Sequence, residues 1–291
     1  MVNDSDVVKN IRDYSFYFNA MDKSVPLKFK LINPWIKSTD KLVLDIGSGS
    51  GQLAYALATA NPQTSILGID ECKEALKWAS NRYQDKVTNL KFFGGEVSSF
   101  SVEKKADVIV ACSVLHEVYS RTANPFQHLK ETLQHLYNNL EQDGRLIIRD
   151  FVAPENSSGE VLIKHYKSDI VAGHSFHEFL QQRNIDKAFG IDYGDYILYF
   201  TNLRDAYEYI YRKDYHENWE PELEETYGFW TGTSAKAILW DAGFKLEYYG
   251  EIDNGWVIEN RLNGKVELLD KDTLSIIPYP KYQCIIVARK S

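Results

Sequence analysis

Residues 41–54 read KLVLDIGSGSGQLA, and this stretch decides the fold. Four apolar residues surround one acid over residues 42–46, a short hydrophobic run of the kind that forms a central parallel strand buried on both faces. Glycines then occupy every second position over residues 47–51, and residues 52–60 have a helical pattern. The glycines let the backbone turn sharply and approach a ligand closely, and the helix start offers N–H groups and a partial positive charge. The stretch therefore predicts a strand, a glycine turn that holds a ligand, and a helix.

Further segments of the chain repeat the alternation of strand and helix. Strands are predicted at residues 65–70, 90–93, 107–112 and 145–150, and an amphipathic helix at residues 126–140. This order favours a parallel sheet with right-handed crossovers. A helix at residues 234–242 and strands at 243–249 and 282–289 complete the pattern, with an extra strand pair expected around the turn dipeptide at residues 263–264.

The composition sets limits on the class of protein. At 291 residues, the chain can hold one large domain or a core domain with a subdomain. No apolar run reaches 18 residues, and the first ten residues are polar, so neither a membrane span nor a signal peptide is predicted. The three cysteines are far apart and lack metal-site spacing, which favours a reducing cytoplasm. A net charge of −8 disfavours a broad nucleic-acid surface.

The spacing D-x-G-x-G-x-G over residues 45–51 differs from the dinucleotide fingerprint G-x-G-x-x-G. It resembles motif I of the class I S-adenosylmethionine (SAM)-dependent methyltransferases of the small-molecule type, whose loop packs against the amino-acid end of the cofactor. The glycines alone leave a nucleotide-binding turn or a plain tight turn open. The resemblance covers residues 41–150 and 234–290. It implies an α/β, Rossmann-like fold with a seven-stranded, mostly parallel sheet, and SAM as the cofactor.

The resemblance also implies which residues contact the cofactor. Asp70 ends the second strand about twenty residues after the glycines, where an acid accepts hydrogen bonds from ribose hydroxyls, although it could simply cap the next helix. Glu96 stands where the family often has an aspartate facing the adenine, and the backbone of Val97 could make that contact instead. The full set of predicted cofactor contacts is Asp45, Gly47, Ser48, Gly49, Gly51, Asp70, Glu71, Glu96, Val97 and Ser113.

Residues 113–116 follow the fourth strand and resemble the S-x-L-H segment of many small-molecule methyltransferases. Neither the N/D-P-P-Y box nor the Pro-Cys site of enzymes that methylate a flipped base is present there. His116 is predicted to be the catalytic base or an orienting group, the alternative being a helix cap or a packing role. Asp150, at the end of the fifth strand, is predicted to support it, the alternative being an ion pair with Arg149.

The regions outside the core are expected to cover it. Residues 1–40 are predicted to form a helical cover with short helices at 11–21 and 27–36, either packing on the sheet edge or closing over the cofactor. Residues 151–233 are predicted to be an aromatic-rich, mostly helical insertion, or lid subdomain, over the carboxyl ends of the strands. Its histidines invite a metal site, but no acid or cysteine completes a set, so no metal is predicted. The predicted substrate contacts are Tyr17, His165, His174, His177, Tyr227 and Trp230.

Methyl transfer from SAM is an in-line displacement that needs alignment, exclusion of water and a nearby base. The sequence therefore predicts a cytoplasmic enzyme that methylates an O or N atom of a small molecule. Two alternatives stay open at this point: an RNA methyltransferase that docks RNA on the insertion, and a regulator that binds SAM without catalysis. The expected partners are a small-molecule substrate and a second copy of the chain, with no nucleic acid and no membrane.

Overall fold

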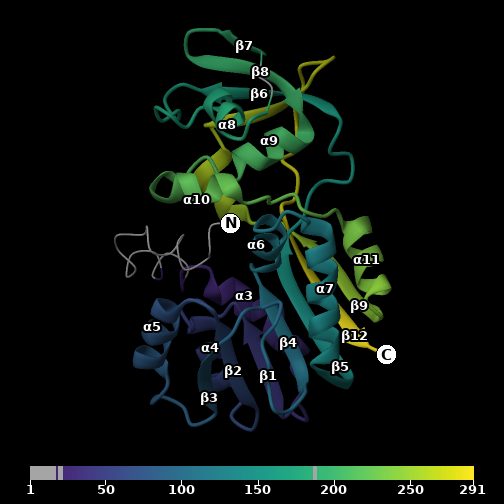
Figure 1. Cartoon of the computed structure of the whole chain (residues 1–291). Helices are drawn as coiled ribbons and strands as arrows, with labels where there is room; N and C mark the ends of the chain where they lie inside the picture. Colours follow the sequence, from purple (N-terminus) through teal and green to yellow (C-terminus); the bar gives the residue numbers. More distant parts are fainter. Residues whose placement is uncertain (1–17, 19–21, 186–188) are drawn as a thin grey trace. The chain divides into compact units, whose positions relative to one another are not determined.

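The computed structural model describes residues 18, 22–185 and 189–291. The chain forms two compact units, drawn with their element labels in Figure 1. The first unit comprises Met1–Asp150, Ser234–Gly250 and Cys284–Ser291, and the second comprises Phe151–Thr233 and Glu251–Gln283.

A seven-stranded sheet forms the centre of the first unit, as predicted. Its strands lie in the order β3 (Leu90–Gly94), β2 (Ser65–Asp70), β1 (Leu42–Ile46), β4 (Ala106–Cys112), β5 (Leu140–Phe151), β12 (Gln283–Lys290) and β9 (Phe244–Ile252). Strands β1 to β5 pair in parallel, with Val43 opposite Val108 and Leu44 opposite Leu67. These strands are apolar on both faces because helices cover both, and Val43, Leu44 and Ile109 are fully buried.

The helices of this unit connect the strands in the predicted order. They are α3 (Val25–Ile32) with the 3₁₀ turn Asn33–Trp35, α4 (Gln52–Ala60), α5 (Lys73–Tyr83), α6 (Leu115–Ser120), α7 (Pro125–Asn138) and α11 (Gly232–Asp241). Helix α7 ends two residues before the predicted limit, because Leu140 already begins strand β5. Of the two helices expected in the N-terminal cover, the one at residues 27–36 corresponds to α3 and its 3₁₀ turn. The one at residues 11–21 lies outside the described residues, except for Phe18.

The expectation that residues 151–233 are mostly helical is wrong. The second unit contains a five-stranded sheet in the order β11 (Ile276–Ile277), β10 (Val266–Asp270), β6 (Glu160–Tyr166), β8 (Tyr196–Asn202) and β7 (Phe189–Asp192). Its helical segments are α8 (Phe176–Gln182), α9 (Leu203–Ile210), the turn His216–Asn218, α10 (Trp219–Glu224), α12 (Gly255–Val257) and Ile258–Leu262. Strands β6 and β8 form an antiparallel pair, but the apolar residues of β6 are consecutive, so the two-residue period of a half-buried strand is not visible in its sequence.

Residues 251–283 belong to this second unit, whereas the sequence analysis placed them with the methyltransferase core. The reason is pairing: β10 runs antiparallel to β6, with Val266 opposite His165 and Leu268 opposite Ile163. The extra strand pair exists as β10 and β11, but its turn lies between them, at residues 271–275. Asn263 and Gly264 precede β10 and do not form the hairpin turn.

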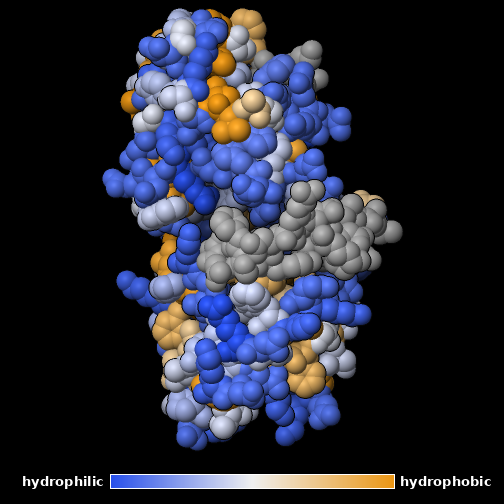
Figure 2. All heavy atoms as spheres, turned by 90° about the vertical axis from the view of Figure 1, so that its left-hand side faces the viewer, coloured by the Kyte–Doolittle hydropathy of each residue, from blue (hydrophilic) through white to orange (hydrophobic). Residues whose placement is uncertain are grey.

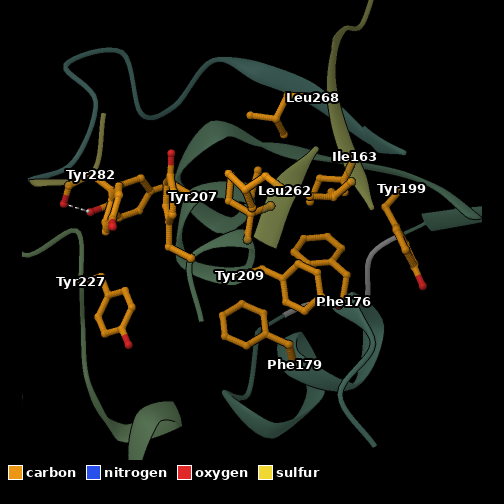
Figure 3. Close-up of a cluster of buried hydrophobic side chains, with 14 of the residues drawn as sticks. Ile163, Phe176, Phe179, Tyr199, Tyr207, Tyr209, Tyr227, Leu262, Leu268 and Tyr282 are labelled. Atoms are coloured by element: carbon orange, nitrogen blue, oxygen red, sulfur yellow. Dashed lines mark hydrogen bonds between the residues drawn. The ribbon is translucent and has the colours of Figure 1, made fainter. Parts of the chain in front are cut away.

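One face of the five-stranded sheet builds the core of the second unit. Ile163 and Leu268 on the strands lie against Phe176 of α8 and Tyr209 of α9, as Figure 3 shows, and all four are fully buried. Helix α8 is fixed at its start by a capping box, in which Ser175 and the side chain of the glutamate at its third position satisfy each other's backbone N–H groups. The aromatic richness of this region therefore serves, in large part, to fill its own core.

Figure 2 shows a face on which hydrophilic residues dominate, with smaller hydrophobic areas between them. Within the described part of the chain, no helix is long and apolar enough to cross a membrane.

Candidate active site

The glycine turn after β1 depends on backbone conformations that only glycine adopts easily. Gly47, Gly49 and Gly51 have φ angles of 65°, 49° and 76°. A Cβ atom on Gly47 would lie 2.6 Å from a methyl group of Val114, and one on Gly51 would lie 2.7 Å from the Phe92 ring. The turn is thus packed tightly against the segment that follows β4 and against strand β3, and this packing fixes its shape.

Asp70, at the end of β2, holds this turn in place. One of its carboxylate oxygens accepts a hydrogen bond from the N–H of Gly49 at 2.7 Å, and the other accepts one from Cys72 at 2.9 Å. Burial raises the pKa of Asp70, while the two backbone hydrogen bonds act in the opposite direction. The carboxylate therefore supports the turn into α5 and lies beside the glycine loop, while its contact with a ribose stays a prediction.

Two more predicted cofactor residues, Glu71 and Glu96, are exposed just beyond the ends of β2 and β3. Partial burial raises the pKa of Glu71, and the negative charge of Glu96 raises it further, so the two carboxylates lie near each other. Ser99 donates a hydrogen bond to Glu96 at 3.0 Å, and Val97, which follows Glu96, is half-buried. This edge of the sheet therefore presents acceptors suited to hydroxyl and amino groups.

A cavity of about 30 Å³ lies beneath the glycine turn. Asp45 and Ser48 line it, and they are only 2% and 8% exposed. Within the described part of the chain, Oδ2 of Asp45 and Oγ of Ser48 have no hydrogen-bond partner. Burial raises the pKa of Asp45 to about 7, more than the neighbouring Lys28 lowers it. Buried polar atoms of this kind are costly, and they point to a polar ligand group as their partner.

His116 and Asp150 form a buried pair at the carboxyl ends of β4 and β5. Nδ1 of His116 lies 2.7 Å from Oδ1 of Asp150. The other carboxylate oxygen accepts hydrogen bonds from the backbone N–H groups of Val114 at 3.1 Å, Leu115 at 2.8 Å and His116 at 3.4 Å. When the carboxylate is ionised it can only accept, and the donor in this hydrogen bond is then Nδ1 of His116.

Ser113, the turn residue between β4 and α6, has φ of 57°, a left-handed conformation that non-glycine residues rarely adopt. Its N–H donates to the carbonyl of Arg149 at 2.7 Å, and its hydroxyl accepts from the Arg149 guanidinium at 2.8 Å. Arg149 thus holds the turn that leads into His116, a role that the sequence analysis did not assign. Asp150 itself pairs with His116.

Three of the predicted substrate contacts are core residues of the second unit. His165 is 1% exposed, and its two ring nitrogens bond with Tyr209 at 3.1 Å and Asp169 at 3.1 Å. Tyr227 stacks on Phe151, with ring centroids 3.9 Å apart, and its hydroxyl donates to Glu222. The indole N–H of Trp230 donates to the Phe151 carbonyl at 2.8 Å. Each of these polar atoms is therefore engaged inside the fold.

The other predicted substrate contacts have different surroundings. His174 lies 2.8 Å from His216, Nδ1 to Nδ1, and stacks on Trp219, with ring centroids 4.5 Å apart. His177 is half-buried on α8. Tyr17 lies outside the described residues. No cluster that contains His165, His174 or His177 among the described residues has the three ligands of a metal site.

Comparisons with known proteins agree with this geometry. A family model described as a methyltransferase domain matches residues 37–202. The uncharacterised methyltransferase YcgJ of Bacillus subtilis is 29% identical over 124 residues, which are 42% of this chain and 46% of that protein. The release factor glutamine methyltransferase of the same organism is 38% identical over 71 residues, which are 24% of this chain and 25% of that protein. The chain thus spans less than half the length of these relatives.

Solved structures give the same fold. Human N-acetylserotonin methyltransferase in complex with SAM has a TM-score of 0.56 at 15% identity, over 99% of this chain and 58% of that one. The pyocyanin biosynthetic protein PhzM has a TM-score of 0.54 at 13% identity, over 97% of this chain and 60% of that one. Identities this low support the fold and not the acceptor.

The sheet order, the glycine turn and the acid at the end of β2 are those of the class I SAM-dependent methyltransferases. Since the family match covers more than half of the sequence, the chain belongs to the methyltransferase domain family, and its cofactor is SAM. The residues fit that cofactor: the glycine turn admits no side chain, and the orphaned oxygens of Asp45 and Ser48 need a polar partner.

Sequence reasoning missed several residues of the site. Lys28 of α3 lines the cavity, and Ser50 accompanies it, donating a hydrogen bond to Asp22 at 2.6 Å. Val114 packs on Gly47, and Arg149 supports Ser113. Ser50 and Val114 are neighbours of the motifs and could have been found from the sequence. Lys28 belongs to no motif, and only the packing of α3 places it at the cavity.

Proposed function

We propose that the protein transfers the methyl group of SAM to an O or N atom of a small molecule, with His116 as the base. The observation that carries the proposal is the buried His116–Asp150 pair at the carboxyl ends of β4 and β5. Ligands of open α/β sheets bind at this end of the strands, next to the glycine turn.

When bound, SAM supplies an electrophilic methyl group on a positively charged sulfur. A hydroxyl acceptor loses its proton as it attacks, whereas an ammonium acceptor must lose a proton before its nitrogen can attack. Nε2 of His116 takes that proton, and the Asp150 carboxylate stabilises the imidazolium that forms. Asp150 also sets the ring orientation, because its second oxygen is anchored by the backbone at the start of α6. The pair therefore needs little rearrangement when the proton moves.

A small acceptor is favoured over a nucleic acid by two features of the sequence. The net charge of −8 gives no electrostatic advantage with a polyanion. The segment 113–116 after β4 reads S-V-L-H and lacks the boxes that hold a flipped base. RNA methylation is the alternative that a strongly salt-dependent RNA affinity would support.

Two further elements of the proposal concern the second unit and the location. His174 and His177 are the predicted acceptor contacts whose side chains are not enclosed in the hydrophobic core. The contact of His174 and His177 with the acceptor is tested by mutating each histidine. We expect a higher KM for the acceptor with kcat retained.

We also propose a cytoplasmic location, since the three cysteines are all free thiols in the structure.

The test of the proposed function is a panel of small phenols, alcohols, carboxylic acids and amines incubated with SAM carrying a labelled methyl group. We expect formation of S-adenosylhomocysteine (SAH) together with one labelled product. We expect the His116→Gln variant to bind SAH as the wild type does and to turn over at least about 100-fold more slowly. Equal turnover by His116→Gln would refute the role of His116, and equal SAH release with and without every acceptor would refute small-molecule transfer.

A further inference from the structure

The cavity beneath the glycine turn contains one opposite-charge pair that no motif explains. Of the described residues that line it, Lys28 is the one cation and Asp45 the one anion. Lys28 comes from α3, before the first strand, while Asp45 comes from within β1. The two side chains are thus brought together by packing and not by their spacing in the sequence.

Helix α3 is fixed at both ends to the elements that flank the glycine turn. Near its start, Asp22 accepts a hydrogen bond from the hydroxyl of Ser50, inside the turn, at 2.6 Å. After its end, Asn33 accepts a hydrogen bond from the side chain of Asn61, the residue that ends α4, at 2.9 Å. Lys28 lies between these two anchors, so its position over the cavity is set by both.

The cavity has unmet polar requirements. Oδ2 of Asp45 and Oγ of Ser48 are buried, and neither has a hydrogen-bond partner among the described residues. A direct ion pair between Lys28 and Asp45 is not present among the described ion pairs, although the lysine lowers the pKa of the acid. The ammonium of Lys28 and the carboxylate of Asp45 line the same small cavity without pairing with each other. They could therefore pair with the carboxylate and the ammonium of an amino-acid zwitterion, which carries both charges on one carbon.

We propose that Lys28 binds the carboxylate of the amino-acid end of SAM, while Asp45 accepts from its α-amino group. Ser48 supplies a hydroxyl that hydrogen bonds to the same end. Residues 22–28 therefore help to bind the amino-acid end of SAM, in addition to covering the edge of the sheet. The inference rests on SAM as the cofactor and is independent of the acceptor.

The test compares a ligand that carries the amino-acid end, which Lys28, Asp45 and Ser48 would bind, with a ligand that lacks it. SAH carries the amino-acid end, whereas 5′-methylthioadenosine keeps the adenosine and the sulfur and lacks it. Dissociation constants for both are measured by isothermal titration on the wild type, on Lys28→Met and on Lys28→Arg. Lys30→Met is the matched control, because Lys30 lies on the same helix and is exposed.

We expect Lys28→Met to weaken SAH binding about 10- to 100-fold, the usual effect of losing a charged hydrogen bond, and to leave methylthioadenosine binding within about twofold. Lys28→Arg should recover part of the SAH affinity, and Lys30→Met should change neither ligand. An equal loss for both ligands would mean that Lys28 only supports the fold, and would overturn the inference. Unchanged SAH affinity would also overturn it. If the wild type bound neither ligand, the cofactor assignment itself would fall, a separate result.

Discussion

Asp150 holds the imidazole of His116 through one carboxylate oxygen, at 2.7 Å, and anchors the start of α6 through the other, which lies 2.8 Å from the N–H of Leu115. The same carboxylate therefore fixes both the ring and the backbone that carries it. Because each task uses a different oxygen, the orientation of His116 is set without any contribution from a ligand. A base that is oriented in advance loses little entropy on reaction.

This arrangement predicts the effect of changing Asp150. In Asp150→Asn, the amide NH₂ can face Nδ1 of His116 or the backbone N–H groups, all of which Asp150 binds as an acceptor. The hydrogen bond with Nδ1 is then lost, or its donor and acceptor are exchanged. The amide is also neutral and no longer stabilises the imidazolium. We expect kcat to fall by about 10²–10⁴ with an SAH dissociation constant within about threefold of wild type. Single-turnover rates and SAH titration measure the two quantities.

The control for Asp150→Asn is His128→Gln, which removes a histidine from α7. It should leave both quantities unchanged. A wild-type rate in Asp150→Asn would show that the carboxylate has no part in catalysis.

The buried Asp45 predicts how stability changes with pH. Its pKa of about 7 in the folded protein lies above the ordinary 3.8, chiefly because of burial. Between these values the folded state keeps a proton that the unfolded state has lost, so the free energy of unfolding falls as pH rises and levels off above 7. From pH 5 to pH 8, Asp45 should cost the ligand-free protein about 2–3 kcal/mol.

The measurement is urea unfolding of the wild type and of Asp45→Asn at several pH values. The difference between the two proteins isolates this group, since all other titrations are shared. A difference that is flat with pH, or that changes in the opposite direction, would contradict a raised pKa.

The glycine turn predicts a large effect of one added methyl group. Gly47→Ala places a Cβ 2.6 Å from Val114 and requires φ of 65° from an alanine. We expect a loss of roughly 2–4 kcal/mol in unfolding free energy, and weaker SAH binding, because the segment leading to His116 must shift. Chemical unfolding and titration with SAH report the two effects.

Gly264→Ala separates backbone strain from the clash. Gly264 has a similar φ of 73°, but a Cβ there would meet nothing within 4 Å. It should cost about 1 kcal/mol and leave SAH binding unchanged. Equal costs at the two positions would mean that the contact with Val114 contributes nothing.

The two stacked histidines of the second unit predict a loss of stability in acid. Burial and the charge of His216 lower the pKa of His174, and Glu178 only partly offsets them. Below pH 6.5 the unfolded chain therefore binds a proton that the folded unit resists, and stability falls as pH falls through this window. The hydrogen-exchange protection factors of α8, which are corrected for the intrinsic exchange rate at each pH, should fall from pH 7 to pH 5 less in His216→Asn than in the wild type. The same fall in both proteins would contradict the coupling.

Much of the first unit could be predicted from the sequence because its signals are local. The apolar run of β1, the glycine spacing and the acid that ends β2 lie within thirty residues, and their packing follows from the rules of parallel sheets. His116 and Asp150 were expected at neighbouring strand ends, and parallel pairing of β4 with β5 brings them together.

The remainder depends on contacts that local patterns do not encode. The pairing of β10 with β6 joins residues about one hundred positions apart, such as Leu268 and Ile163, and each strand alone is too short to show its partner. His165 looked like a ligand contact, but burial and two hydrogen bonds make it a core residue. Lys28 has no motif around it, and only the packing of α3 reveals its place.

The proposed role of His116 in methyl transfer is tested by a single-turnover reaction of wild type and His116→Gln. The reaction uses SAM carrying a labelled methyl group and the acceptor found in the panel, and SAH affinity is determined in parallel. We expect a labelled product from the wild type, a rate at least about 100-fold lower in the variant, and equal SAH affinities. Equal rates, or a slow variant that also fails to bind SAH, would contradict that role.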